Sequence, residues 1–465
     1  MTDAGEPRGG RSLEAAGRRP LRSVVLYTAD PWDSALPLLR VRGPAEVMGL
    51  SVVRGNEGDA VAPERVSQAD LVIVQRDFPR FGGAWQAVST RAWAEGKPVI
   101  YELDDLLLDL PEGHEKERAY YSDVLFSILR AAVEADAIVA STEPLARYLA
   151  PFNPEVHLLP NSLDDRLWPL AERAAPAEPG GPVVVGYMGG QTHLPDLLAI
   201  TPALLSVLDR YGERVRFQFW GVQPPAALLA RPNVAWTPLK IISYADFASY
   251  FAAQHCDVFM APLRDNTFNR CKSGIKYLEY GALGAAGVFS RLDPYDKIVQ
   301  PGVNGLLASS QAEWEESLGQ LIESPELRQS LGAGARATVR RDWLLSNRAP
   351  AWLQLYQELA AAGRRSVLLE PHRQVLARVA EQVQGRQHEL EERLATLGRQ
   401  AFAQEAELRE IHNSPAWHMA QTISALRFRL APRGSRREKW LDRLTTARRP
   451  TAPADNGTGD APRAG

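Results

Sequence analysis

Four side chains that could hold a phosphorylated sugar lie close together: Lys272, Ser273, Lys276 and Glu279. They follow the apolar run 256–263, which is typical of a buried parallel strand, so their loop leaves the carboxyl end of that strand. A helix that begins near Ser273 would offer free amide N–H groups, and the two ammonium groups would add positive charge for a phosphate. Glu279, two turns into the helix, could accept hydrogen bonds from sugar hydroxyls. The pattern indicates a nucleotide-sugar pocket.

The same side chains also have a purely structural interpretation. Lysine and glutamate residues that share a helix face are often only solvated. Lys276 and Glu279, three residues apart, could form an ordinary ion pair. The spacing leaves both interpretations open.

The segment IKYLEYGALGAAGVFS, residues 275–290, resembles the LEAMAxGxPVV segment of the family-four GT-B glycosyltransferases, which use nucleotide sugars with retention. Glu279 matches the second glutamate of that family's E-x7-E motif, and Cys271 stands in place of the first. The form FN-x-x-KS-x-x-K-x-LEY, which includes Asn269, resembles a bacterial branch found with O-antigen and other surface-polysaccharide genes. The resemblance implies a nucleotide-sugar donor, no cofactor and no metal, with Lys272 carrying the charge.

Composition limits the class of protein. A chain of 465 residues with 45% apolar content predicts two or three domains with sizeable cores. The net charge of -3 argues against nucleic acid as a partner of the whole protein. Two cysteines without paired spacing argue against a disulfide framework or a cysteine metal site, and they fit a reducing cytosol.

No targeting or membrane-spanning segment is expected. Residues 1–22 lack the apolar core of a signal peptide and are predicted to be a disordered lead. No apolar run reaches the roughly 18 residues that span a bilayer. We expect a cytoplasmic protein that is at most peripheral at the inner face of the plasma membrane.

The first half of the chain alternates strands with helical stretches. Strands are expected over 23–30, 69–77 and 97–105, and a helical segment over 115–134. This rhythm predicts a doubly wound parallel sheet with functional loops at the carboxyl ends of its strands. The adjacent carboxylates of Asp104 and Asp105 fall on one of these loops.

Three interpretations apply to this acidic pair. Adjacent carboxylates can hold Mg²⁺ on a diphosphate. Alternatively, they could favour the N-terminus of a short helix within 102–114. In the family that the chain resembles, the equivalent strand ends in a histidine-aspartate pair, and Asp104 stands in the place of the histidine. We interpret Asp104 as a polar or basic group on the acceptor side.

The second half repeats the rhythm. The strand 182–190 ends in Gly189 and Gly190, which would permit close backbone approach to a phosphate, although a plain turn has the same pattern. Thr192 could cap the next helix. The family's arginine and lysine after this turn are absent, which leaves His193 as a donor to the diphosphate or sugar, or as a surface histidine.

Connecting segments resemble the same family. The segment 156–169 resembles its VxPNGVD hinge through Pro160, Asn161 and Asp164, and the Ala-, Pro- and Gly-rich stretch 171–182 is predicted to be a linker. Residues 342–359 resemble the helix that crosses back to the first domain. Its predicted packing residues are Trp343, Trp352 and Tyr356.

The last hundred residues differ in kind. Apolar residues recur at heptad spacing from 376 to 411 within the segment 366–412, which favours a two-stranded coiled coil and a homodimer. A single amphipathic helix lying on the globular part is the alternative. Residues 413–449 interleave arginines with large apolar groups, which suits an anionic membrane surface better than nucleic acid. The segment 450–465 is predicted to be a disordered tail.

The fold class predicted is α/β: a GT-B enzyme with two Rossmann-like doubly wound domains facing a cleft, 23–170 for the acceptor and 183–340 for the donor. A crossover helix (341–362) and a helical coiled-coil extension follow. The function implied is transfer of a sugar from a nucleotide-diphosphate donor to a saccharide or lipid-linked acceptor. A catalytically degenerate scaffold and a nucleotide-sugar epimerase are the alternatives.

Overall fold

The computed structural model describes residues 21–80, 82–168, 170, 181–241, 243–365 and 370–446. The predicted lead, linker and tail lie almost entirely outside the described residues.

The first domain is built on a six-stranded parallel sheet in the order β2-β1-β5-β6-β7-β8. Every residue of β5, β6 and β7 is buried, as expected for a parallel sheet covered on both faces. The strands are β1 (Ser23–Thr28), β2 (Ser51–Arg54), β5 (Leu71–Gln75), β6 (Val99–Leu103), β7 (Ala137–Ala140) and β8 (Val156–Leu158). A small hairpin, β3 (Asn56–Glu57) with β4 (Ala60–Val61), follows β2.

Helices cover both faces of this sheet. They are α1 (Ala35–Pro37), α2 (Gly43–Val47), α3 (Gly82–Ala94), α4 (Glu115–Ser122), α5 (Leu125–Glu134) and α6 (Glu143–Leu149), and a π-helical turn, Leu38–Arg42, joins α1 to α2. The single helix expected over 115–134 is wrong, because the chain breaks between α4 and α5. The short helix considered within 102–114 is also absent, since this stretch forms turns, and so Asp104 caps no helix.

The second domain has its own six-stranded parallel sheet, in the order β11-β10-β9-β12-β13-β14. The strands are β9 (Val183–Gly189), β10 (Val215–Gly221), β11 (Val234–Thr237), β12 (Val258–Ala261), β13 (Ala286–Ser290) and β14 (Leu306–Ala308). The order reverses between β9 and β12. In doubly wound sheets, ligands bind at this switch point, outside the carboxyl ends of the strands.

The helices of this domain pack against its sheet in two hydrophobic cores. They are α7 (Leu194–Tyr211), α8 (Ala226–Leu229), α9 (Tyr244–Ala252), α10 (Thr267–Arg270), α11 (Ile275–Ala282), α12 (Gln311–Glu323) and α13 (Pro325–Asp342). A 3-10 turn over Gln191–His193 precedes α7. The predicted capping by Thr192 is wrong, because His193 occupies the N-cap position and no side chain caps α7.

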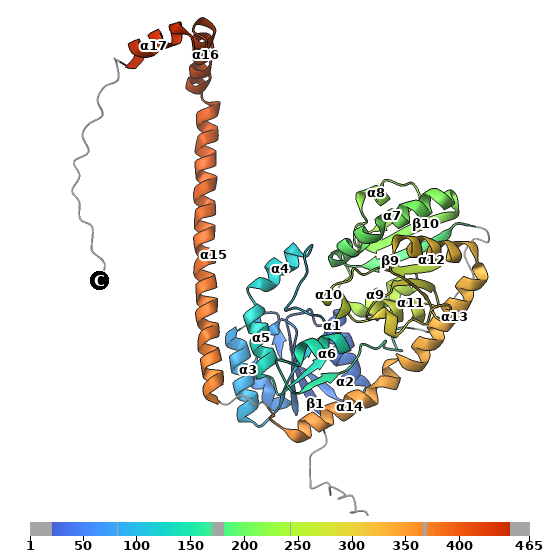
Figure 1. The fold of residues 1–465 in the computed structure, drawn as a ribbon. Coiled ribbons are helices and arrows are strands. Elements are labelled where there is room, and N and C mark those ends of the chain that lie inside the picture. The colour runs from blue at the N-terminus through green and yellow to red at the C-terminus, as the bar shows by residue number, and fades with distance from the viewer. Residues whose placement is uncertain are drawn as a thin grey trace, which may run out of the picture. The chain divides into compact units, whose positions relative to one another are not determined.

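Helix α14 (Leu345–Ala362) returns to the first domain and packs against α2 (Figure 1). Trp352 and Tyr356 are buried in one core with Val24 and Ile73, which confirms the predicted packing of both aromatic residues. Trp343, at the junction with α13, is only half-buried.

The long C-terminal helix is also confirmed, as α15 (Glu370–Asn413). Its first residues belong to the compact unit that ends at 384, where the Arg373 guanidinium lies 3.7 Å from the centre of the Trp93 ring. The described residues 385–446 belong to a second compact unit, with α16 (Pro415–Leu430) and α17 (Arg436–Thr446). Among the described residues, no helix is both long and apolar enough to cross a bilayer.

Candidate functional site

Loops at the carboxyl ends of the two sheets meet directly. Thr142 Oγ1, after β7, donates to the carbonyl of Cys271 at 2.7 Å. Asn161 Nδ2, after β8, donates to Ser273 Oγ at 2.9 Å. On the far side of the boundary, the backbone N–H of Tyr244 donates to the carbonyl of Asp33 at 2.9 Å. The prediction of two Rossmann-like domains that face each other is confirmed.

The segment before α11 inserts into the first domain. Phe268 and Cys271 are buried in the core that contains Tyr101 and Leu103 of β6. Burial raises the pKa of the Cys271 thiol to about 12, so this side chain is uncharged at neutral pH. The residue that replaces the family's first glutamate therefore fills apolar space and supplies no carboxylate.

Three side chains form a chain of hydrogen bonds at the switch point. Lys276 Nζ lies 3.0 Å from His193 Nε2, and His193 Nδ1 lies 2.9 Å from Asp196 Oδ2. An ammonium group can only donate, so the Nε2 atom accepts and the Nδ1–H donates to the carboxylate. The predicted residues His193 and Lys276 thus meet, and Asp196 fixes the tautomer of the histidine.

Asp196 also joins the loops that follow β9 and β12. Its Oδ1 atom accepts from the backbone N–H of Arg264 at 2.9 Å and from Asn269 Nδ2 at 2.9 Å. Asn269 is buried, and its own Oδ1 atom lacks a partner among the described residues. Burial raises the pKa of Asp196, but the hydrogen bonds from His193 and from the backbone N–H of Arg264, with the charge of Lys272, keep that pKa below its ordinary value.

The electrostatics of this cluster favour an incoming anion. Burial, followed by the charges of Lys276 and Lys272, lowers the pKa of His193 to about 3, so the imidazole is neutral. Burial and the neighbouring Lys272 lower the pKa of Lys276 to about 8. Two close cations in a half-buried place repel each other, and a diphosphate between them would relieve that repulsion.

Lys272 lies where the two domains face each other. Its Nζ atom is 4.3 Å from the centre of the Phe268 ring. Burial would raise the pKa of Asp105, but the charge of Lys272 first, and then that of Arg76, hold it below its ordinary value. The charges of Lys272 and Asp105 therefore attract each other across the boundary between the two domains.

Asp104 is bound by an arginine of the neighbouring strand. Arg76 Nη1 lies 2.9 Å from Asp104 Oδ1. The backbone of Arg76 has a φ of 51°, in the left-handed region, which is strained for a residue other than glycine. Burial raises the pKa of Asp104 to about 7 against the attraction of Arg76. Among the described residues, no group of three or more His, Cys, Asp and Glu side chains is placed to hold a metal ion.

The remaining predicted residues have distinct environments. Glu279 is only 3% exposed, and its Oε1 atom accepts from the Tyr244 hydroxyl at 3.0 Å. Burial raises its pKa to about 7, against the charge of Lys276. A Cβ atom at Gly189 would lie 2.7 Å from the Tyr187 hydroxyl, whereas Gly190 is exposed and open. Thr192 is half-buried beside it.

Sequence reasoning missed Asp196, Arg76 and Tyr244 as parts of this cluster. Two of them carried a usable signal. Asp196 stands three residues after His193, which places both on one helix face, and Arg76 directly follows the buried strand β5. Tyr244 had no such signal, because its contact with Glu279 joins elements 35 residues apart.

We expect Asp196→Asn to lower kcat/KM for the donor roughly 10- to 100-fold, since hydrogen bonds that involve charged groups contribute about 1.5–3 kcal/mol. An amide cannot accept on both sides. If its oxygen keeps the bonds from Arg264 and Asn269, its NH₂ faces His193 Nδ1, which forces the proton to Nε2 and turns two donors toward each other at Lys276. Steady-state kinetics with a nucleotide sugar measure the effect.

Asp209→Asn is the matched control, because Asp209 lies on the same helix and pairs only at the surface, with Arg231 at 2.7 Å. We expect this control to retain full activity. Equal kinetics for the two variants would show that Asp196 does not position the cluster.

Comparisons with known proteins support this architecture. Residues 202–354 match the model of a family described as glycosyl transferase-like. The fold resembles HepE from Anabaena, solved with UDP-glucose, at 14% identity and a TM-score of 0.50 over 73% of this chain and 100% of that chain. A sucrose-phosphate synthase from Thermosynechococcus elongatus is similar at 14% identity and a TM-score of 0.53, over 74% of this chain and 100% of its own.

A glycosyltransferase from Rickettsia africae aligns at 11% identity with a TM-score of 0.51, over 74% of this chain and 99% of its own. No curated protein sequence matches the chain. These likenesses, with the strand orders above, show the architecture. The chain has the GT-B fold, and the match to the glycosyl transferase-like family covers most of its second domain and the first part of α14.

Proposed function

We propose that the protein transfers a sugar from a nucleoside diphosphate donor to a saccharide or lipid-linked acceptor, in cell-surface polysaccharide synthesis. The observation that carries this proposal is the pair of close lysines at the switch point of the second sheet, opposite the carboxylates of the first. HepE, whose fold is similar, was solved with UDP-glucose, which supports a donor of this class.

In this proposal the main catalytic effect is electrostatic. Lys272 and the amide groups at the start of α11 stabilise the diphosphate as the glycosidic bond loosens, Lys276 adds charge, and His193 orients it. Glu279 holds the ribose after exchanging its bond to Tyr244, and Gly190 and Thr192 border the phosphates. Neither a metal nor a cofactor is needed. Retention of the anomeric configuration rests on the resemblance, and NMR of the product's anomeric proton tests it.

Product analysis with a panel of nucleotide sugars tests the proposal. We expect nucleoside diphosphate release that rises when oligosaccharides are added and persists in EDTA. An epimerase would change the donor sugar without releasing nucleotide. A degenerate scaffold would neither release nucleotide nor show the rise in melting temperature that a ligand of the native state causes.

The pH dependence tests Asp104 as the group that receives the acceptor's proton. Because its pKa is raised to about 7, it is protonated below that pH and can act as a base only above it. We expect kcat/KM to fall as the pH drops through about 7, and Asp104→Asn to remove this limb. The control is Asp123→Asn, which removes an exposed carboxylate of the same domain and should leave the fall in kcat/KM below pH 7 unchanged. If Asp104→Asn also keeps this fall, another group is the base.

The C-terminal unit carries two further proposals. Leu390, Leu394, Leu397, Leu408 and Ile411 are exposed along α15 at heptad spacing, which favours a homodimer, and sedimentation equilibrium of the full chain measures it.

Helices α16 and α17 expose Trp417, Ile423 and Trp440 among basic side chains. Residues 415–446 contain seven Arg or Lys against two Asp or Glu, a net charge of +5. We propose that this segment binds anionic membranes. Cosedimentation with phosphatidylglycerol vesicles, but not with phosphatidylcholine vesicles, is expected.

A further inference from the structure

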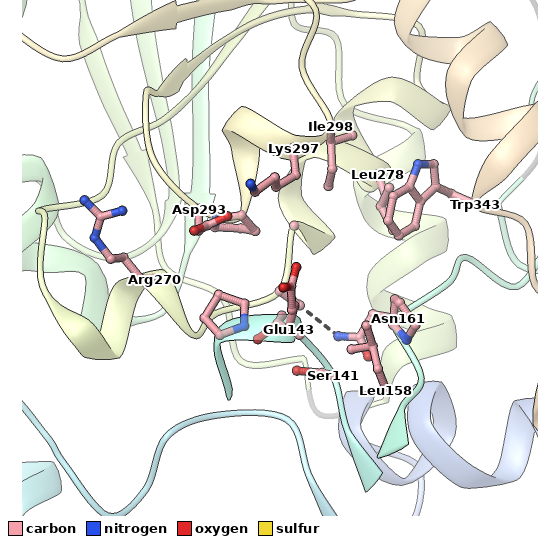
Figure 2. A pocket seen from close by; sticks show the side chains of 16 residues that line it. Ser141, Glu143, Leu158, Asn161, Arg270, Leu278, Asp293, Lys297, Ile298 and Trp343 are labelled. Atoms are coloured by element: carbon pink, nitrogen blue, oxygen red, sulfur yellow. Dashed lines mark hydrogen bonds between the residues drawn. The ribbon is translucent and has the colours of Figure 1, made fainter. Parts of the chain in front are cut away.

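A cavity of about 180 Å³ lies between the two domains, and Ser273 is among the residues that line it. Its walls come from the exits of β7 and β8 in the first domain and from the segment after β13 in the second. Figure 2 shows Glu143 on one wall and Asp293 and Lys297 on the other, with Trp343 beside Leu278 and Ile298 at one end.

The cavity combines two kinds of surface. Trp343, Leu278, Ile298, Pro160 and Pro294 form apolar walls, while charged groups of both signs stand among them. A site for a free phosphate would present cations without adjacent carboxylates, and a site for a lipid chain would be uncharged. A sugar ring has an apolar C–H face and a rim of hydroxyls that both donate and accept, which needs both kinds of surface.

Some of the charged groups are already engaged. Arg270 donates two hydrogen bonds of 2.7 Å to Asp265, and one oxygen of Glu143 accepts from Arg147 at 2.7 Å. Asp293 shares a hydrogen bond with Asp296, and burial and Asp296 raise the pKa of Asp293. Lys297 and the remaining oxygen of Asp293 are therefore the groups left for a ligand.

We propose that this cavity binds one pyranose ring of the acceptor saccharide. The proposal rests on the proposed sugar transfer and makes it more specific, since it favours a glycan-bearing acceptor. Ser273 lines the cavity and is the next residue in the chain after Lys272. A ring held in the cavity would therefore contact the same loop that carries the lysine assigned to the diphosphate. Asn161, which donates to Ser273, ties the first domain to the same wall.

Saturation-transfer NMR tests this directly, with the methyl glycosides of glucose, galactose, mannose and N-acetylglucosamine as probes. We expect at least one glycoside to bind the full-length protein. Asp293→Ala and Lys297→Ala should each weaken that binding roughly 10- to 100-fold, as loss of a charge-assisted hydrogen bond predicts. Leu158→Trp, at a residue that is 44% exposed on the cavity rim, should block it sterically.

Donor turnover without acceptor separates this proposal from the general function. The three cavity variants should release nucleotide from the sugar donor at the wild-type rate and raise only the KM for an oligosaccharide. Asp209→Asn is the control. If donor turnover occurs but no glycoside binds and the acceptor KM is unchanged in the variants, the cavity assignment is wrong and the transferase proposal stands. Glycoside binding without any donor turnover would overturn the transferase proposal instead.

Discussion

Replacing Lys272 with alanine is expected to lower kcat for sugar transfer about 100- to 1,000-fold, the usual cost of removing one preorganised electrostatic group from an active site. Its ammonium group is half-buried above Phe268 and is the strongest single influence that keeps Asp105 ionised. In the proposed transition state, negative charge grows on the departing diphosphate. Lys276, the other lysine of the cluster, is hydrogen-bonded to His193 and does not replace Lys272. Initial rates at saturating donor measure the loss.

Lys97→Ala is the matched control for Lys272. Lys97 precedes β6 at the end of the strand opposite to Asp104, where it pairs with Glu95 at 2.9 Å. We expect this variant to keep its kcat, and Lys272→Arg to recover part of the activity. Retention of more than about a third of the wild-type kcat by Lys272→Ala would argue against an electrostatic role.

Replacing Arg40 with methionine is expected to lower the free energy of unfolding by roughly 3–5 kcal/mol, as when one partner of a buried ion pair is removed. Arg40 and Glu102 are both fully buried, and their side chains lie 2.5 Å apart. The same guanidinium donates to the carbonyl of Leu159 at 2.6 Å and to Asn161 at 2.8 Å, and it lies 4.9 Å from the Trp352 ring centre. The variant would leave the Glu102 carboxylate buried without its cation.

Arg147→Met is the control for this effect, since Arg147 lies on α6 of the same domain and pairs with Glu143, with the two side chains 74% and 65% exposed. Exposed pairs contribute about 0–1 kcal/mol, so a small change is expected. Urea denaturation compares the two variants. Equal losses would show that Arg40 does not hold the hinge segment, the first sheet and α14 together.

The sequence was sufficient to predict the fold, because buried parallel strands read as continuous apolar runs. Those over 69–77 and 256–263 became β5 and β12, and the βα rhythm indicated two doubly wound sheets. Local helix boundaries were less accurate. Thr192 has the right chemistry for a cap, but a 3-10 turn places His193 at that position instead.

The candidate site was only partly accessible from sequence. His193 and Lys276 were found separately, but their hydrogen bond spans 83 residues and depends on the β9–β12 switch point. Arg76, Asp104 and Asp105 meet because parallel neighbours end at the same edge of the sheet. The sequence did not explain why Cys271 stands in place of the first glutamate of the motif. The structure does, because this side chain is buried in the core of the first domain.

A crystal structure of the protein with UDP would show where the diphosphate binds. We expect the diphosphate to lie between the exits of β9 and β12, with an oxygen within about 3.5 Å of Lys272 Nζ. Binding of UDP elsewhere, with neither Lys272 nor Lys276 in contact with its phosphates, would overturn the assignment of this site.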